Sequence, residues 1–325
     1  MGAVSECNSV SQKKVQLMRA ARTDKGVHAL GQVISVKVVF RPNLLRVLNE
    51  ALPEDIRVFD IQLVTGSFDA RMSCESRVYE YIMPTYVFAE GIPPPPSPEM
   101  AKWVYEHDVP GPQRAKGHKK ERRGGGERDG NLGRELAGDQ EANNEDEDDE
   151  EDEDDAEEQE VRTRRKVEMD LEESPEVRRE REAFRLRAEK LEGIRALFKQ
   201  YEGTKNFHNF TSGRAPQDKS CKRYMMSVEV EAPRMIAGTE WVTIKIHGQS
   251  FMLHQIRKMV GLVVSMTKTN ADQHIFQRCF THEKLHVPIA PGTGLFLSHP
   301  MYPAYNKKAV RCLQAPFTLK KAEVR

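Results

Sequence analysis

The stretch Ala20-Ala21-Arg22-Thr23-Asp24-Lys25-Gly26-Val27-His28-Ala29 places a single carboxylate, Asp24, between two basic side chains. Gly26 follows, and glycine permits a tight turn here because it has no Cβ atom. Residues 31–40 then alternate between apolar and polar side chains, which predicts a strand. Asp24 is therefore expected on a short loop entering a sheet, where a rigid scaffold commonly presents reactive groups. The charge pattern by itself favours a solvated surface turn.

The charges of the chain are unevenly distributed. The 325 residues contain 50 Lys and Arg and 50 Asp and Glu, so the formal net charge is zero. Fourteen of the acidic residues lie within positions 145–160, which hold no Lys or Arg, so the rest of the chain carries a net charge of +14. A basic body suits a polyanionic partner such as nucleic acid. Two other interpretations stay open: an ordinary basic protein with a disordered acidic loop, and an acidic tract that itself binds basic proteins.

The cysteine pattern, the apolar runs and the histidine spacing indicate the cellular compartment and which partners the protein lacks. The five cysteines are scattered without a Cys-x-x-Cys pair, which is typical of reduced thiols in a cytosolic or nuclear protein. The apolar run at 259–266 is far shorter than a membrane span, and the N-terminus lacks a signal-peptide pattern, so no membrane partner is expected. No metal is expected either, since His282 and His286 lie four residues apart without an evident third ligand.

Hydrophobic periodicity predicts an α+β protein. The predicted helices cover residues 43–51, 178–201 and 252–267. Besides 31–40, the predicted strands cover residues 56–64, 76–83, 241–247 and 295–298.

A long charged segment separates two structured halves. Residues 91–178 have low hydrophobicity and cannot bury enough apolar surface to offset their ordering entropy, which predicts a disordered insertion. The expected organisation is an N-terminal half with the Asp24 loop, the insertion, a C-terminal half and a tail, over residues 1–90, 91–178, 179–310 and 311–325.

A second distinctive stretch is Gly248-Gln249-Ser250-Phe251-Met252-Leu253-His254-Gln255-Ile256-Arg257-Lys258-Met259-Val260-Gly261. Leu253, Ile256 and Val260 have the spacing of one helix face that packs in a core. Arg257 interrupts this apolar helix, and its residue type alone would fit an arginine that extends to the surface.

These two stretches, in this order, resemble the active-site motifs of the TruA-type tRNA pseudouridine synthases. Their amino-acid sequences are most similar to those of the eukaryotic branch. Residues 68–73, 77–81, 206–211 and 290–297 resemble further segments of the same family. The resemblance implies two ferredoxin-like halves around a basic cleft. It also implies isomerisation of uridine to pseudouridine in tRNA, without a cofactor.

The resemblance implies three catalytic residues. Asp24 would act on the ribose, either as a nucleophile at C1′ or as a base at C2′. Arg257 would pair with Asp24 and favour its ionised form. Tyr79, in the strand Arg77-Val78-Tyr79-Glu80-Tyr81, would stack on the uracil.

Three further residues would bind the substrate. Arg22 would occupy the gap left by the extruded base, and Leu295 would pack against the uracil. Arg71 belongs to the matching stretch Phe68-Asp69-Ala70-Arg71-Met72-Ser73 and is expected to contact RNA.

The chain departs from the family pattern before the Asp24 loop. Family members carry a strand and a helix there, with a Tyr-x-Gly segment, whereas only 23 residues precede Asp24 here. The first half is therefore expected to lack a strand. The alternative function is a non-catalytic RNA-binding protein or an inactive shortened form of such an enzyme.

The resemblance also bears on location. The eukaryotic branch is typically nuclear or mitochondrial, and we favour the nucleus, with the cytoplasm as a further option. The run Arg162-Thr163-Arg164-Arg165-Lys166 fits a signal for nuclear import factors. A solvated basic run that balances the acidic tract is an equally good interpretation.

Overall fold

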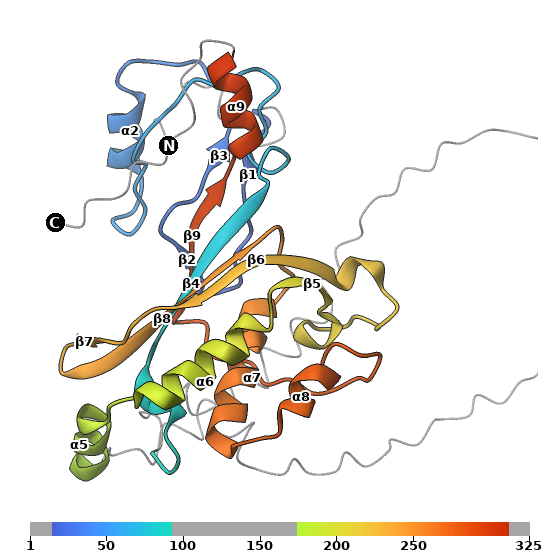
Figure 1. Ribbon diagram of the computed structural model, residues 1–325. Helices are drawn as coiled ribbons and strands as arrows, with labels where there is room; N and C mark the ends of the chain where they lie inside the picture. Colours follow the sequence, from blue (N-terminus) through green and yellow to red (C-terminus); the bar gives the residue numbers. More distant parts are fainter. Residues whose placement is uncertain (1–14, 93–173, 312–325) are drawn as a thin grey trace, which may run out of the picture. The chain divides into compact units, whose positions relative to one another are not determined.

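The computed structural model describes residues 15–92 and 174–311 (Figure 1). Most of the predicted insertion, and the tail apart from residue 311, lie outside the described residues, so the prediction of disorder stays a prediction. The described part has the predicted α+β architecture.

The main sheet contains seven strands among the described residues. Its order is β2-β9-β4-β8-β6-β5, and β7 pairs with β8. Neighbouring strands are antiparallel, except that β2 and β9 are parallel. The strands are β2 (His28–Ala29), β4 (Ser76–Pro84), β5 (Gly203–Asn206), β6 (Lys222–Val230), β7 (Arg234–Ile236), β8 (Thr239–Gly248) and β9 (Leu295–Met301). Both predicted halves thus contribute strands to one sheet.

The long strands β4 and β8 bury alternate side chains, as a period of two requires. Tyr79, Tyr81 and Met83 of β4 are buried, and Ile244 and Ile246 of β8 are fully buried. These residues join one large hydrophobic core with strand β9. The predicted strands at 76–83, 241–247 and 295–298 are confirmed within a few residues at their ends.

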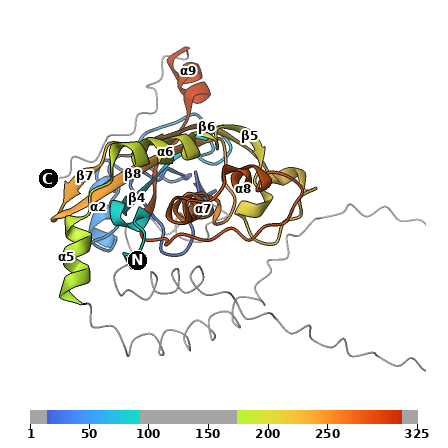
Figure 2. The same ribbon diagram turned by 60° about the horizontal axis from the view of Figure 1, so that its bottom comes forward.

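Helices α6 (Ala188–Lys199) and α7 (Gln255–Thr269) lie side by side in Figures 1 and 2 and complete this core. Helix α6 packs on β6, and α7 buries Met259, Val260 and Val263. The other helices are α2 (Leu44–Ala51), α5 (Pro175–Ala183), α8 (Gln273–Arg278) and α9 (Pro303–Arg311), with short 3-10 helices η1 (Thr85–Phe88), η2 (His208–Phe210) and η3 (Lys219–Cys221).

The predicted helix at 178–201 is wrong, because the structure has α5 and α6 with an extended break between them. Phe184 adopts φ −60° and ψ 137°, and the buried Leu186 donates its N–H to Glu240 Oε1 at 2.8 Å. This bond fastens the break to the start of β8. Helix α5 also begins at Pro175, inside the predicted insertion, and α7 begins at Gln255 rather than residue 252.

Two predicted strands of the N-terminal region are also wrong. Within residues 31–40 only β3 (Ile34–Ser35) is a strand, and it pairs with β1 (Met18–Arg19) in a separate two-stranded sheet. Residues 56–64 form no strand. Their apolar side chains include Phe59 and Leu63, which stay exposed because no described segment pairs with this stretch. The helix α2 agrees with the prediction for 43–51.

No helix within the described residues is long and apolar enough to cross a membrane. The same residues hold no group of three or more His, Cys, Asp or Glu that could bind a metal ion.

Candidate active site

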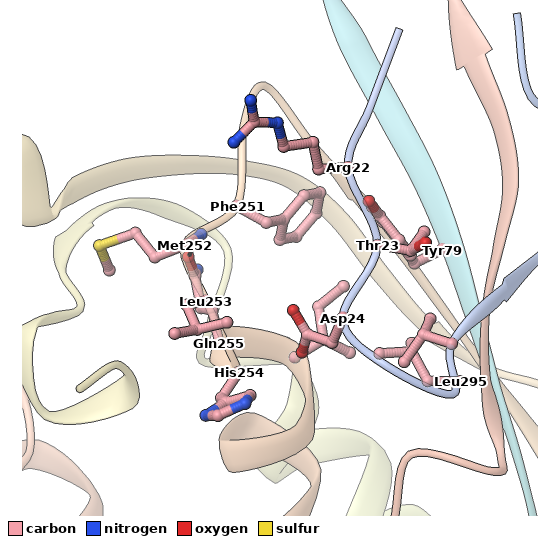
Figure 3. A pocket seen from close by; sticks show the side chains of 12 residues that line it. Arg22, Thr23, Asp24, Tyr79, Phe251, Met252, Leu253, His254, Gln255 and Leu295 are labelled. Carbon is pink, nitrogen blue, oxygen red and sulfur yellow. Dashed lines mark hydrogen bonds between the residues drawn. The ribbon is translucent and has the colours of Figure 1, made fainter. Parts of the chain in front are cut away.

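A cavity of about 360 Å³ lies between the Asp24 loop, strand β4 and the segment that leads into α7 (Figure 3). It brings together Arg22, Asp24, Tyr79 and Leu295, four of the six predicted site residues. The side chains that line it belong to Arg22, Thr23, Asp24, Val27, Tyr79, Phe251, Met252, Leu253, His254, Gln255, Ile256 and Leu295. In Figure 3 the Asp24 carboxylate points from its loop toward the facing segment that carries Phe251 and Leu253.

The C-terminal side of the Asp24 loop is fixed by a turn and a strand pair. Gly26 has φ +76°, a conformation that favours glycine, and the N–H of Val27 donates to the Asp24 carbonyl at 3.0 Å. Strand β2 then pairs with Phe296 and Leu297 of β9. The loop therefore enters a sheet, as predicted, although through β2, which lies before the strand predicted at 31–40.

The N-terminal side of the loop is held by Arg77 and Gln32. The guanidinium of Arg77 donates to the Ala20 carbonyl from Nη2 at 2.8 Å and from Nε at 3.2 Å. Its Nη1 donates to the carbonyl of Gln249 at 2.9 Å. Gln32 Nε2 donates to the Ala21 carbonyl at 2.9 Å. Arg77 thus joins both walls of the cavity, a role that the sequence did not reveal because its partners are backbone atoms distant in sequence.

Tyr79 forms an apolar wall of the cavity. Its ring meets the Phe251 ring edge to face at 5.1 Å, with an interplanar angle of 77°. Burial raises the pKa of Tyr79 to about 12, while Arg77 lowers it and Asp24 raises it further. The phenol is therefore protonated at neutral pH and can donate a hydrogen bond.

Leu295 is buried at the start of β9, and the loop before it is clamped onto β4. Tyr81 Oη donates to the Pro291 carbonyl at 2.8 Å, and the Ile82 N–H donates to the Gly294 carbonyl at 2.9 Å. A Cβ atom on Gly294 would overlap the carbonyl oxygen of Ile82, so this close approach requires glycine. Leu295 thus lines the same cavity as Asp24, and its contact with the uracil stays a prediction.

His254 is a cavity residue that the sequence reasoning missed. It precedes α7 in a left-handed conformation (φ 59°, ψ 2°), which is uncommon for a residue other than glycine. Burial lowers the pKa of His254, while nearby Asp24 acts in the opposite direction and Arg257 adds to the lowering. Its Nδ1 is buried and has no hydrogen-bond partner among the described residues. Its only sequence signal was its place inside the second motif.

The structure does not place Arg257 as predicted. Within the described residues, no ion pair closer than 4.0 Å joins Arg257 to Asp24. Its Nε donates instead to the Ala290 carbonyl at 2.7 Å, and its own carbonyl accepts the Ala290 N–H at 3.1 Å. Arg257 therefore supports the loop that leads to Leu295, because the Ala290 carbonyl of this loop lies within reach of its guanidinium.

Arg71 lies outside the cavity. It is exposed on the turn after Phe68, where the Asp69 carboxylate accepts its backbone N–H at 2.8 Å. Its predicted contact with RNA stays a prediction.

An α+β fold that presents an aspartate, a buried tyrosine and a leucine at one cavity matches what the family resemblance implies. The family model described as tRNA pseudouridine synthase matches residues 197–303. Proteins named tRNA pseudouridine synthase 1 are 42% identical over 94% of this chain in Yarrowia lipolytica, 39% over 94% in Saccharomyces cerevisiae and 33% over 94% in Schizosaccharomyces pombe.

The chain belongs to the tRNA pseudouridine synthase family. It covers 58%, 56% and 67% of the three relatives, respectively. The chain thus spans little more than half the length of most of the curated relatives it matches.

Proposed function

We propose that this protein isomerises uridine to pseudouridine in tRNA. The observation that carries the proposal is the shared cavity of the Asp24 carboxylate, the buried Tyr79 and Leu295 in a chain of this family. Its volume of about 360 Å³ is within the range of small-molecule sites and suits one extruded nucleotide.

The reaction breaks the bond from ribose C1′ to N1 of uracil and joins C1′ to C5 of the same base, while C5 loses a proton and N1 gains one. The products contain the same atoms as the substrate, so the reaction requires no net oxidant or group donor. Asp24 acts on the ribose, either by attack on C1′ or by removal of the C2′ proton. Either step uses the ionised carboxylate, held by its loop in a fixed direction.

The remaining cavity residues hold the base. The protonated Tyr79 and the apolar Leu295 contact the uracil, and Phe251 supports Tyr79 through its ring edge. Arg22 is exposed at the end of the loop, where it can fill the gap left in the RNA by the extruded base. Arg257 acts as a positioning residue for the Leu295 loop, and Arg71 contacts the RNA backbone.

The proposal is tested by Asp24→Asn, which keeps the shape of the side chain and removes its charge. We expect pseudouridine formation in a tRNA transcript, measured by mass spectrometry, to be abolished. The affinity for the tRNA should stay within several-fold, because phosphate contacts dominate the binding. Asp55→Asn, an exposed position outside the cavity with the same change of charge, is the matched control. Turnover by the Asp24→Asn protein would refute the assignment.

We propose nuclear import through the run Arg162-Thr163-Arg164-Arg165-Lys166, which lies outside the described residues. A fluorescent fusion of the protein in which the three Arg and the Lys of this run are changed to Gln should lose nuclear accumulation. An unchanged distribution would refute the signal.

A further inference from the structure

A second cavity, of about 340 Å³, borders helix α7 and is lined by basic side chains. We call it the Lys258 cavity. Arg214, Lys258, Lys284 and His286 contribute to its wall, and no carboxylate side chain does. Two acidic groups lie beside this wall. Glu283 pairs with Arg278 through Oε2 at 2.9 Å, whereas Asp218 pairs with Arg214 of the wall at 3.2 Å and compensates its charge.

The Lys258 cavity is held in shape by a buried amide. Asn209, 3% exposed, donates through Nδ2 to the carbonyls of Cys279 and Glu283 at 3.0 and 2.8 Å. Its Oδ1 accepts the N–H of Leu285 at 2.9 Å. These three bonds fix the loop that carries Lys284 against helix η2. The wall is therefore fixed by hydrogen bonds of a buried side chain and does not consist of surface lysines alone.

The main feature of the cavity is the uncompensated charge of Lys258. Its half-buried ammonium donates to the carbonyls of Thr211 and Asn209 at 3.0 and 3.3 Å, which leaves one N–H of three for another acceptor. No carboxylate lies within 4.0 Å of it among the described residues, and burial lowers its pKa. A cation withdrawn from water without a counter-ion is unfavourable, and an anion in the cavity would relieve this cost.

A buried polar atom in the wall is also unsatisfied. The ring of His208, 3% exposed, lies 3.1 Å from the Glu283 carbonyl through Nε2. Its Nδ1 has no partner among the described residues. Because Nε2 must donate to this carbonyl oxygen, Nδ1 can donate to an anion only when the ring carries both protons, so the charge of Lys258 carries the argument.

Helix α7 connects this cavity to the candidate active site. Gln255 and Ile256, at its start, line the Asp24 cavity, and Lys258, two residues further, lines the second one. The two cavities therefore share helix α7, and one RNA molecule with its uridine beside Asp24 could contact both. We propose that the Lys258 cavity binds a phosphodiester group of that RNA, an inference that rests on the proposed function. Such a contact would fix the register of the strand without reading its sequence.

The first test measures the salt dependence of RNA binding. Arg214→Gln with Lys284→Gln removes two charges from the wall, and Lys307→Gln with Lys308→Gln removes two exposed charges from α9 as a control. All variants carry Asp24→Asn, and the probe is a fluorescent tRNA transcript. Each phosphate contact contributes about 0.7–0.9 to the slope of log affinity against log salt. We expect a smaller slope for the cavity variant and an unchanged slope for the control.

The outcomes of this test distinguish failure of the phosphate site from failure of the proposed function. Equal slopes in the two variants would overturn the phosphate site and leave the proposed function standing, because pseudouridine formation is measured separately. Absence of tRNA binding by every variant would refute both. Between 50 and 200 mM salt, each lost contact should make the decline in affinity about threefold smaller.

The second test locates the contact. Acetylation of lysines, read by mass spectrometry, should show that tRNA protects Lys284 but leaves Lys307 reactive. Lack of protection at Lys284 would overturn the proposal. Protection that is already complete without RNA would overturn it too, since Lys284 would then be covered by something other than RNA.

Discussion

Residues 15–75 and residues 186–301 are built very differently. The later region has paired strands, helices α6 and α7 and a continuous core that includes the fully buried Tyr201, Phe207 and Phe276. The earlier region has a two-stranded sheet with two residues in each strand, and a small cluster of buried side chains. Its exposed apolar side chains include Phe40 and Phe59, each at least half exposed.

The candidate catalytic carboxylate belongs to the loosely packed region, although the cavity belongs mostly to the well-packed one. Asp24 is positioned by contacts to the other region, through Arg77 and through the pairing of β2 with β9. The difference teaches that stability and activity should respond to different residues. Core packing should control unfolding, and a few links to the Asp24 loop should control turnover.

The largest expected effect is on unfolding. Phe276→Ala removes a fully buried ring from the aromatic cluster and should lower the free energy of unfolding by about 3–5 kcal/mol. Phe59→Ala, at a ring that is 52% exposed, should change it by less than about 0.5 kcal/mol. Urea unfolding followed by circular dichroism measures both. Equal losses would show that residues 15–75 pack as tightly as the later region.

The second-largest expected effect is on the rate of turnover. Arg77→Met breaks the links to Ala20 and Gln249, and a displaced catalytic group can cost about 10²-fold in rate. We expect kcat to fall by this amount while tRNA affinity is retained. Arg77→Lys should recover only part, because an ammonium lacks the planar fork that reaches both carbonyls.

Arg195→Met is the control for Arg77, since Arg195 Nε donates to the Val230 carbonyl at 3.0 Å far from the cavity. It should leave kcat within a few-fold. An equal loss of kcat in the two variants would mean that Arg77 supports the fold generally rather than the Asp24 loop.

The smallest effect concerns pH at the junction of the two regions. Burial lowers the pKa of His254 and of His247, so the folded protein binds protons there less readily than the unfolded chain. Stability should therefore fall as the pH drops below about 6.5, the unfolded value. His254→Gln should flatten part of this decline in the thermal melting temperature, whereas His274→Gln, at an exposed position, should not. Parallel curves for the two variants would remove His254 as a contributor.

The sequence predicted the well-packed region better than the loose one. Strands β4, β8 and β9 bury alternate side chains, and α7 buries a helical face, so local periodicity reports their environment. Residues 56–64 carry a similar apolar pattern, but periodicity cannot say whether a partner strand exists. The break between α5 and α6 escaped prediction because it depends on the contact of Leu186 with Glu240.

The candidate site divides in the same way. Asp24, Tyr79, Leu295 and Arg22, which line one cavity, could be named from the sequence because each lies in a motif that the family resemblance identified. The predicted pairing of Arg257 with Asp24 is not present, because residue type and spacing do not show that the Ala290 carbonyl lies within reach of the guanidinium. Arg77 and Asn209 act on backbone atoms, and such partners leave no pattern in the sequence.

The central position of β4 has a consequence for the order in which the chain acquires its structure during synthesis. Both neighbours of this strand, β8 and β9, lie far downstream, and the bond from Ser298 Oγ to Glu80 Oε1 spans 218 residues. The strand therefore leaves the ribosome long before its partners exist. Such distant pairings fold slowly, and an unpaired edge invites aggregation. The Asp24 cavity can be assembled only after β9, which ends at Met301, has been made, so a nascent chain without β9 should be inactive.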